Sequence, residues 1–369
     1  MTRHAHYVGS LPGEIISGGD LAVMRWFVEN SAGKPITAIP CDLDPDWLVV
    51  YLRERAQHAD VFEAHKPGDY TGYGDFPDNR VRRGQTLRPQ HVSMNRVERI
   101  GRVVENFTKL RAEHPELADT KLQVGLPNPL DVSMFVFAGR AVSGGLPVGR
   151  AFAHANLVVR ALRHLPVFVE AAITEVTEIQ RRYGDLVVWQ LESPFALLAM
   201  VKATQLRSRW ALGPLVAQQF AGLLTRMHET GAETVVHLCY GDLAHESLLT
   251  PSTLAPAVNL LDRAARLLRQ SKVPLPPVHI PCAYGPESAP LRPEFYTPLG
   301  KLDPDWQLIA GVVSPESADD SARALTLFER AAHRTSYGVA TACGLGRGTV
   351  EAAKQAAATM VELTEAAPA

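Results

Sequence analysis

Residues Val235–Tyr240 read VVHLCY, a short run of apolar and β-branched residues that also carries a histidine and a cysteine. Seven similar runs occur along the chain. They are His6–Leu11, Pro35–Cys41, Leu122–Asn128, Leu186–Leu191, Val278–Cys282, Leu308–Val313 and Tyr337–Cys343. Runs this short, bounded by glycine and proline, are typical of buried parallel strands.

Helix-length segments separate these runs, and each carries apolar residues at intervals of three to four. They are Asp20–Asn30, Asp46–Ala59, Asn95–His114, Arg150–Tyr183, Gly213–Thr230, Ser252–Gln270, Ala318–His333 and Thr349–Glu365. Strand and helix thus alternate eight times, which is the number that closes a (β/α)8 or TIM barrel. We therefore predict an α/β fold with residues 1–369 as a single TIM-barrel domain, although two smaller doubly wound domains also fit the length.

The segment His65–Pro89 interrupts this alternation because it is rich in glycine, proline and aspartate. It is predicted to be a long loop inserted after the second β/α unit. A loop at that place lies on the face of a barrel that holds the active site. Two hypotheses follow: a lid that carries tyrosines and arginines, or a surface insertion without a catalytic part. The lid residues would be Tyr70, Tyr73, Arg80, Arg82 and Arg83.

The composition of the 369-residue chain, 46% hydrophobic and 21% charged, is typical of a soluble protein with a large core. Lysine and arginine (37) nearly balance aspartate and glutamate (39), so neither nucleic acid nor an anionic membrane is expected as a partner. The polar first residues do not resemble a signal peptide, and we predict a cytoplasmic protein. The oligomeric state is left open.

All four cysteines fall at the carboxyl end of a predicted strand, where TIM-barrel enzymes build their active sites from residues distant in sequence. His237 and Cys239 lie two residues apart on one strand and therefore point to the same face. Cys343 ends the last strand and is followed by glycine. A His/Cys/Cys set suits zinc, although ordinary buried strand residues produce the same His-x-Cys pattern.

A further zinc ligand is expected from the sixth strand, where His279 and Cys282 compete. Residues three apart on a strand point to opposite faces, so one of the two is expected to face the barrel mouth. We include His279 in the predicted metal site. Asp242, just after the His-x-Cys strand, is predicted to orient His237 without itself binding the metal.

Acidic and small residues at three other strand ends are candidate substrate-binding groups. Glu192 follows the apolar run of the fourth strand and is predicted to hold a substrate ammonium. Asp42, after the second strand, is also a candidate for binding the ammonium, unless it caps the helix that follows. Gly9 and Ser10 form a turn that can bind a carboxylate through backbone N–H groups and a hydroxyl, although a plain tight turn has the same sequence.

Five sequence blocks occur in the order seen in cobalamin-independent methionine synthase. They are Val8-Gly9-Ser10-Leu11-Pro12, Glu192-Ser193-Pro194, His237-Leu238-Cys239-Tyr240-Gly241-Asp242, Ala310-Gly311-Val312-Val313-Ser314-Pro315 and Cys343-Gly344-Leu345-Gly346-Arg347. Over nearly its whole length the chain resembles the catalytic carboxyl-terminal barrel of that enzyme, in the superfamily that includes uroporphyrinogen decarboxylase. It is similar to the short, single-barrel relatives.

This resemblance implies a zinc-dependent methyltransferase of methionine biosynthesis. The implied zinc ligands are His237, Cys239 and Cys343. Zinc would hold homocysteine or a similar thiol as the reactive thiolate, which takes a methyl group from a donor such as 5-methyltetrahydrofolate. Ser10 would lie near the carboxylate of the amino acid and Glu192 near its ammonium, with Glu192 and Asp242 as the predicted catalytic groups.

The chain departs from the family's pattern at two places. The family's sixth-strand zinc ligand is a glutamate, whereas this sequence has His279 and Cys282 there, and the family's histidine before the seventh-strand Ser-Pro is Val313 here. Two alternative hypotheses therefore stand beside a methionine-synthase-like methyltransferase. One is a specialised paralogue that acts on another substrate in a biosynthetic pathway, and the other is a metal-free lyase of the decarboxylase branch.

Overall fold

The structure is a computed structural model that describes residues 2–42, 44–66, 68, 75–143, 151–243, 246–247, 252–283 and 287–367. Of residues 151–154, 209, 242–243 and 246–247 it describes the backbone alone. The chain divides into two compact units. Unit 1 consists of Met1–Pro45, Arg99–Leu126 and Gln180–Ala369, and unit 2 consists of Asp46–Glu98 and Pro127–Ile179. The single domain remains a prediction.

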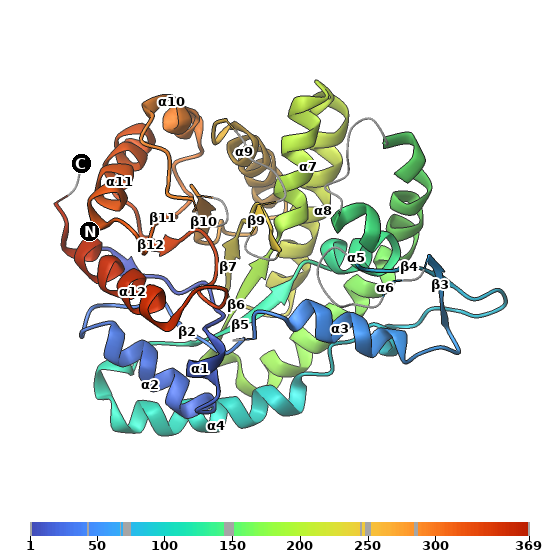
Figure 1. Cartoon of the computed structure of the whole chain (residues 1–369), viewed down its shortest axis with the longest axis horizontal. Coiled ribbons are helices and arrows are strands. Elements are labelled where there is room, and N and C mark those ends of the chain that lie inside the picture. Colours follow the sequence, from blue (N-terminus) through green and yellow to red (C-terminus); the bar gives the residue numbers. More distant parts are fainter. Residues whose placement is uncertain are drawn as a thin grey trace. The chain divides into compact units, whose positions relative to one another are not determined.

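Unit 1 is built around an eight-stranded parallel sheet (Figure 1). Its strands are β1 (His4–Ala5), β2 (Ile39–Pro40), β5 (Leu122–Pro127), β6 (Val187–Glu192), β7 (Thr234–His237), β10 (Val278–Pro281), β11 (Leu308–Val313) and β12 (Gly338–Thr341). From β2 to β12 and then β1, each strand pairs with the next one along the chain. A parallel bridge between Ala5 and Ile36, just before β2, joins the two ends of the sheet. The fold is therefore α/β and TIM-barrel-like, as the alternation of runs predicts.

The strands form where the sequence offers short stretches that can be buried on both faces. Every residue of β5 and β11 is buried, which explains why these stretches are continuously apolar rather than alternating. Two of the later helices, α11 (Ala318–Ala332) and α12 (Val350–Glu365), begin at a residue whose side chain accepts from a free backbone N–H group. The Thr349 hydroxyl, for example, accepts a hydrogen bond from the Ala352 N–H at the start of α12.

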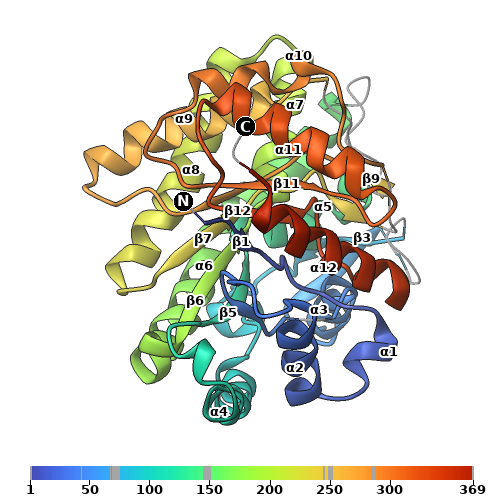
Figure 2. The same cartoon turned by 90° about the vertical axis from the view of Figure 1, so that its left-hand side faces the viewer.

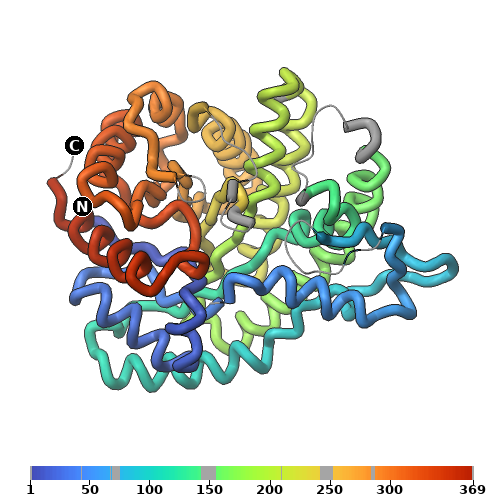
Figure 3. The backbone as a smooth tube through the Cα atoms, in the orientation of Figure 1, coloured from blue at the N-terminus to red at the C-terminus, as the bar shows by residue number. Residues whose placement is uncertain are grey.

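Helices of unit 1 surround these strands. They are α1 (Gly13–Ile16), α2 (Asp20–Asn30), α4 (Val97–Glu113), α7 (Pro194–Gln205), α8 (Arg209–Glu229), α9 (Ala255–Gln270), α10 (Pro293–Tyr296), α11 (Ala318–Ala332) and α12 (Val350–Glu365). In Figure 2 the strands β7, β12 and β1 lie between α8 and α9 on one side and α12 and α2 on the other. Residues near the two ends of the chain lie close together (Figure 3), since the Arg3 guanidinium donates to the Leu363 and Ala366 carbonyls at the end of α12.

Three elements differ from the sequence-based expectation. The first strand ends at Ala5, before the predicted run His6–Leu11, because Gly9 (φ 137°) and Ser10 (φ 30°) turn the backbone out of the sheet. The region before β7 holds two helices, α7 and α8, instead of the one helix predicted from Gly213. A further helix, α5 (Pro129–Ser143), follows β5.

Unit 2 contains α3 (Trp47–Ala56), β3 (Phe62–Lys66), β4 (Asp78–Val81), α5 and most of α6 (Ala151–Tyr183). A buried ion pair stabilises it, since the Arg96 guanidinium lies 2.8 Å from the Glu175 carboxylate and both side chains are less than one tenth exposed. Strands β3 and β4 pair in an antiparallel ribbon.

This ribbon corrects part of the predicted loop His65–Pro89, which contains β4 and the last residues of β3. Across the ribbon the Arg80 guanidinium pairs with the Glu63 carboxylate at 2.6 Å, and the buried Phe62 ring packs against Phe137. Tyr70 and Tyr73 lie outside the described residues. The lid therefore remains a prediction.

The remaining regular elements are short. Strands β8 (Asp242–Leu243) and β9 (Glu246–Ser247) pair antiparallel after β7. Single turns of 3-10 helix occur at Pro89–His91, Pro115–Leu117, Gly184–Leu186 and Thr297–Lys301. In the part of the chain that the structure describes, every helix is too short or too polar to cross a lipid bilayer.

Glu329→Ala is expected to lower the free energy of unfolding by about 3–5 kcal/mol, because it leaves a buried guanidinium without its partner. In the native protein Arg3 Nε and Nη2 donate to the two Glu329 oxygens at 2.7 Å each, and both side chains are 2% exposed. The matched control is Glu113→Ala, which breaks the half-exposed pair with Arg25 and should cost about 0–1 kcal/mol. Urea titration measures both, and equal losses would contradict the prediction.

Candidate metal centre

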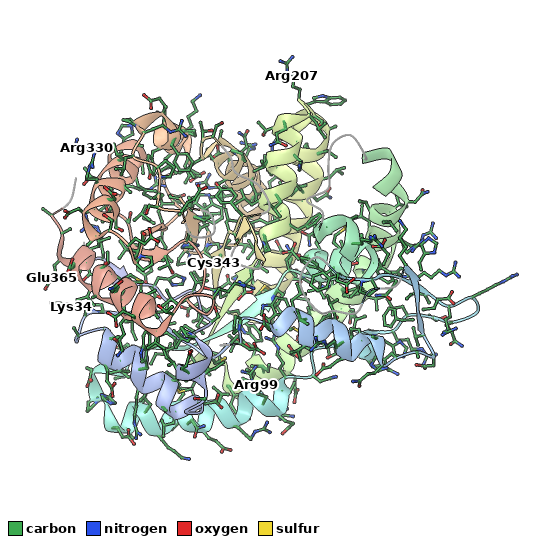
Figure 4. The ribbon with its side chains drawn as sticks, in the orientation of Figure 1. Lys34, Arg99, Arg207, Arg330, Cys343 and Glu365 are labelled. Atoms are coloured by element: carbon green, nitrogen blue, oxygen red, sulfur yellow. The ribbon has the colours of Figure 1, made fainter. Side chains whose placement is uncertain are left out.

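Three residues that sequence analysis places in a metal site lie together at the carboxyl ends of the strands. One ligand atom each from His237, Cys239 and Cys343 lies within 4.8 Å of the other two. His237 is the last residue of β7, and Cys343 follows the end of β12 by two residues. The Cys239 and Cys343 sulfurs are 3.7 Å apart. Figure 4 shows Cys343 in the middle of unit 1, away from the periphery where Arg330 and Glu365 lie.

This cluster has the chemistry and the spacing that zinc requires. Two thiolates and an imidazole are soft ligands that suit zinc. A tetrahedral zinc with Zn–S bonds of about 2.3 Å places two sulfurs about 3.8 Å apart, and the observed sulfur separation is 3.7 Å. Three protein ligands leave one position for an exchangeable group, which is the arrangement of catalytic zinc sites. The residues present therefore fit zinc.

His279 lies beside this cluster rather than in it. Its Nδ1 is 2.8 Å from Nδ1 of His237, and its Nε2 is 2.9 Å from the Thr341 carbonyl oxygen. Both of its ring nitrogens thus have partners within the protein. Burial lowers the pKa of His279 to about 4 and holds the pKa of His237 well below its ordinary value, so both imidazoles are neutral at neutral pH.

Cys282, the other sixth-strand candidate, lies away from the ligand cluster. Its side chain is fully buried, and its Sγ donates to the Ile280 carbonyl at 3.6 Å. Burial raises the pKa of the Cys282 thiol, which keeps the sulfur protonated and unsuited to metal binding. Of the two competing residues, His279 is thus the one next to the metal-ligand cluster.

The carboxylates of Asp42 and Glu192 meet above a glycine of β5. A Cβ atom at Gly125 would lie 2.8 Å from Glu192 Oε1 and 3.3 Å from Asp42 Oδ2, so a larger residue here would displace both. Asp42 is fixed by the Gly125 N–H at 2.7 Å and by the Arg99 guanidinium at 3.2 Å. The two carboxylates outnumber the one guanidinium of Arg99, so the net negative charge at this place suits an ammonium group.

Glu192 is connected to the segment that follows β1 through Gln190, two residues before it on β6. The Gln190 amide donates to the Val8 carbonyl at 2.6 Å and lies 3.3 Å from Glu192 Oε1. Glu192 is also the register partner of His237 on the neighbouring strand β7. Glu192, predicted to bind an ammonium group, and His237, predicted to bind a metal, therefore lie side by side at the carboxyl ends of the strands. We call this edge of the sheet the rim.

The Gly9-Ser10 turn ties three strand ends together. The Ser10 N–H donates to the Asp42 carbonyl at 3.2 Å, and the Ser10 hydroxyl accepts from the Gly346 N–H at 3.2 Å. A Cβ at Gly344 would lie 2.1 Å from the Ser10 hydroxyl, so this glycine is required for the contact. The backbone N–H predicted to bind a carboxylate is thus used within the protein, and the hydroxyl proton is what Ser10 can still offer.

Two further sequence-based expectations concern the rim. The backbone of Asp242 begins β8, but its side chain lies outside what the structure describes, so its role toward His237 remains a prediction. Val313 ends β11 and is 3% exposed. No proton can come from this side chain.

Sequence reasoning missed four residues that shape this site. Gln190 could have been predicted from the sequence, because a residue two positions before Glu192 on a strand points to the same side. Arg99, Gly311 and His6 carry no such signal, since their contacts join elements distant in the sequence. Burial lowers the pKa of His6 to about 3, and its ring stacks on His279 with centroids 6.0 Å apart.

A TIM-barrel-like fold with a His/Cys/Cys cluster at the carboxyl ends of its strands is typical of metal-dependent barrel enzymes. Solved structures that share this fold include a methionine synthase and a methyltransferase. A B12-independent methionine synthase from Shewanella sp. W3-18-1, in complex with selenomethionine, is similar with a TM-score of 0.55 at 14% identity over 98% of each chain. A methyltransferase from Methanosarcina mazei is similar with a TM-score of 0.52 at 12% identity, covering 99% of this chain and 95% of that chain.

At this level of identity the two structures establish likeness of fold. No protein-family model matches the sequence, and no curated protein matches it.

Cys239→Ser and Cys343→Ser are each expected to abolish stoichiometric zinc binding, because each removes one of two thiolates from a three-ligand site. The control is Cys282→Ala, which removes a buried thiol outside the cluster and should leave zinc content unchanged. Elemental analysis of the purified proteins measures this. Full zinc content in both serine variants would show that the ligand cluster is assigned wrongly.

Proposed function

We propose that the chain is a zinc-dependent methyltransferase that moves a methyl group onto a thiol. The observation that carries this proposal is the convergence of His237, Cys239 and Cys343 within 4.8 Å at the carboxyl ends of two parallel strands. The shared fold of a methionine synthase and a methyltransferase supports the same class of chemistry.

Zinc in this cluster would lower the pKa of a substrate thiol and hold it as the thiolate nucleophile. The chain's own residues bind and orient the rest of the substrate. Asp42 and Glu192 hold its ammonium group, while Arg99 and Gln190 keep these two carboxylates in place. The Ser10 hydroxyl is positioned to donate to its carboxylate. An α-amino-acid thiol such as homocysteine satisfies all these groups.

In the proposed reaction the thiolate sulfur attacks the methyl carbon of the donor, a 5-methyltetrahydrofolate-like molecule. A C–S bond forms as the C–N bond of the donor breaks, and the electron pair goes to the donor nitrogen, which takes up a proton. Val313 cannot supply that proton because its side chain is apolar and buried. In this proposal the donor nitrogen takes its proton from solvent.

The residues at the rim argue against one of the two alternative hypotheses and favour the other. A metal-free lyase would bind a polycarboxylate, but the paired carboxylates of Asp42 and Glu192 repel such a substrate. A specialised paralogue with a different thiol or donor is favoured by Val313 and by His279, which stand where the family has a histidine and a glutamate. This second candidate uses the same metal cluster.

The test is to incubate zinc-loaded protein with homocysteine and 5-methyltetrahydrofolate and to analyse the thiols by mass spectrometry. A gain of one methyl group on the thiol is expected, and it should be absent in Cys239→Ser. Methylation of a different thiol from a panel would identify the specialised paralogue. No methyl transfer to any thiol by a protein with full zinc content would refute the proposal.

Glu192→Gln is expected to raise KM for homocysteine about 10–100-fold, because a charge-assisted contact with the ammonium group is worth about 1.5–3 kcal/mol. KM for 4-mercaptobutanoate, which has no amino group, should change little. Steady-state kinetics with both thiols measure this difference. Glu233→Gln serves as the control, since Glu233 is an exposed partner of Lys121. An equal rise in KM for both thiols would contradict the assigned role.

A further inference from the structure

We propose that His279 is a positioning residue, which fixes the tautomer and the orientation of the His237 imidazole so that His237 Nε2 is the metal-binding nitrogen. This inference rests on the proposed function in one respect, that a metal ion occupies the His237, Cys239 and Cys343 cluster. It concerns a residue that lies outside that cluster and contacts one of its members, His237, through the imidazole ring.

A chain of hydrogen bonds sets the protons of both rings. The Thr341 carbonyl can only accept, so His279 Nε2, 2.9 Å away, must carry a hydrogen. His279 is 0% exposed, and a buried imidazolium without an anionic partner is costly, so the ring is neutral and its Nδ1 holds a lone pair. That lone pair accepts from His237 Nδ1, 2.8 Å away.

The consequence for His237 follows from imidazole chemistry. A neutral imidazole with its hydrogen on Nδ1 has its lone pair on Nε2. His237 is itself 3% exposed, so solvent does not compete for either nitrogen. The pair with His279 therefore leaves Nε2 unprotonated and ready to bind a metal ion. A hydrogen-bond partner behind a metal-binding histidine commonly has this effect.

The sheet holds the two rings in this arrangement. His237 and His279 are register partners on the adjacent parallel strands β7 and β10, and their rings stack with centroids 4.7 Å apart. On the other side of His279, strand β11 has a glycine. A Cβ at Gly311 would lie 2.5 Å from His279 Nε2 and 3.0 Å from Cε1, so only glycine leaves room for the ring.

The first experiment compares two nearly isosteric substitutions, His279→Asn and His279→Leu, in the full-length protein. The asparagine amide oxygen can accept from His237 Nδ1, whereas leucine offers no acceptor. Zinc affinity is measured by competition with a chromophoric chelator, and we expect it to fall about 10–100-fold in His279→Leu and to recover largely in His279→Asn. The Co²⁺-substituted proteins report the same order through their thiolate-to-metal absorption.

A merely structural role predicts a different order, because a buried asparagine is harder to accommodate in a core than leucine. Equal affinity in the two variants, or native affinity in His279→Leu, would overturn the proposal. Urea unfolding of the metal-free proteins shows that each variant is folded. Gly311→Ala is the independent check, because it displaces the His279 ring while all three metal ligands and His279 itself remain, and it should also weaken zinc binding.

A second readout needs no metal. Two-dimensional ¹H–¹⁵N spectra of metal-free protein with ¹⁵N-labelled histidine distinguish the tautomers, and His279→Leu identifies the signals. His237 is expected as the Nδ1–H form and His279 as the Nε2–H form. An Nε2–H tautomer at His237 would overturn the proposal.

The outcomes separate this inference from the proposed function. A parent protein that binds zinc and methylates thiols, with unchanged affinity in His279→Leu, would refute the positioning role alone. Zinc binding that depends on His279, without methyl transfer to any thiol, would support the positioning role and refute the function. A parent protein without zinc affinity would refute both.

Discussion

The parallel direction of the eight strands is the constraint on which the candidate site depends. Parallel strands in one closed sheet bring all their carboxyl ends to the same rim, so residues far apart in sequence become neighbours. Cys239 and Cys343 are 104 positions apart, and their sulfurs lie 3.7 Å from each other. An antiparallel arrangement of the same segments would send half of these ends to the opposite side.

Glycines in the strands and rim loops decide which polar side chains fit at that rim. Gly125 leaves room for the carboxylates of Asp42 and Glu192, Gly311 leaves room for the His279 ring, and Gly344 allows the Ser10 hydroxyl to approach the Cys343 loop. In each case an added Cβ would come within 2.8 Å of a polar atom. These positions therefore support the site through the space that the absence of a side chain leaves free.

The eight runs of apolar residues predict the strands well because a strand buried on both faces needs a continuous apolar sequence. Local spacing also brings His237 and Cys239 to one face, and their position at a strand end predicts Cys343 as a neighbour. The place of His279 was not accessible in this way, since its partner is set by the register between β7 and β10. The first strand was misplaced because the backbone turn at Gly9 and Ser10 has apolar residues on both sides.

In the proposed zinc site, the net charge of the ligand set depends on the residue that the sixth strand supplies. With two thiolates and a neutral imidazole the ligand set carries two negative charges, which a divalent ion balances, whereas an added glutamate ligand would leave a net negative centre. A neutral centre attracts a further thiolate more strongly than a negative one does. Under the proposed function, His279 would support His237 without adding charge, and Asp42 with Glu192 would bind the ammonium group at a separate, negatively charged place nearby.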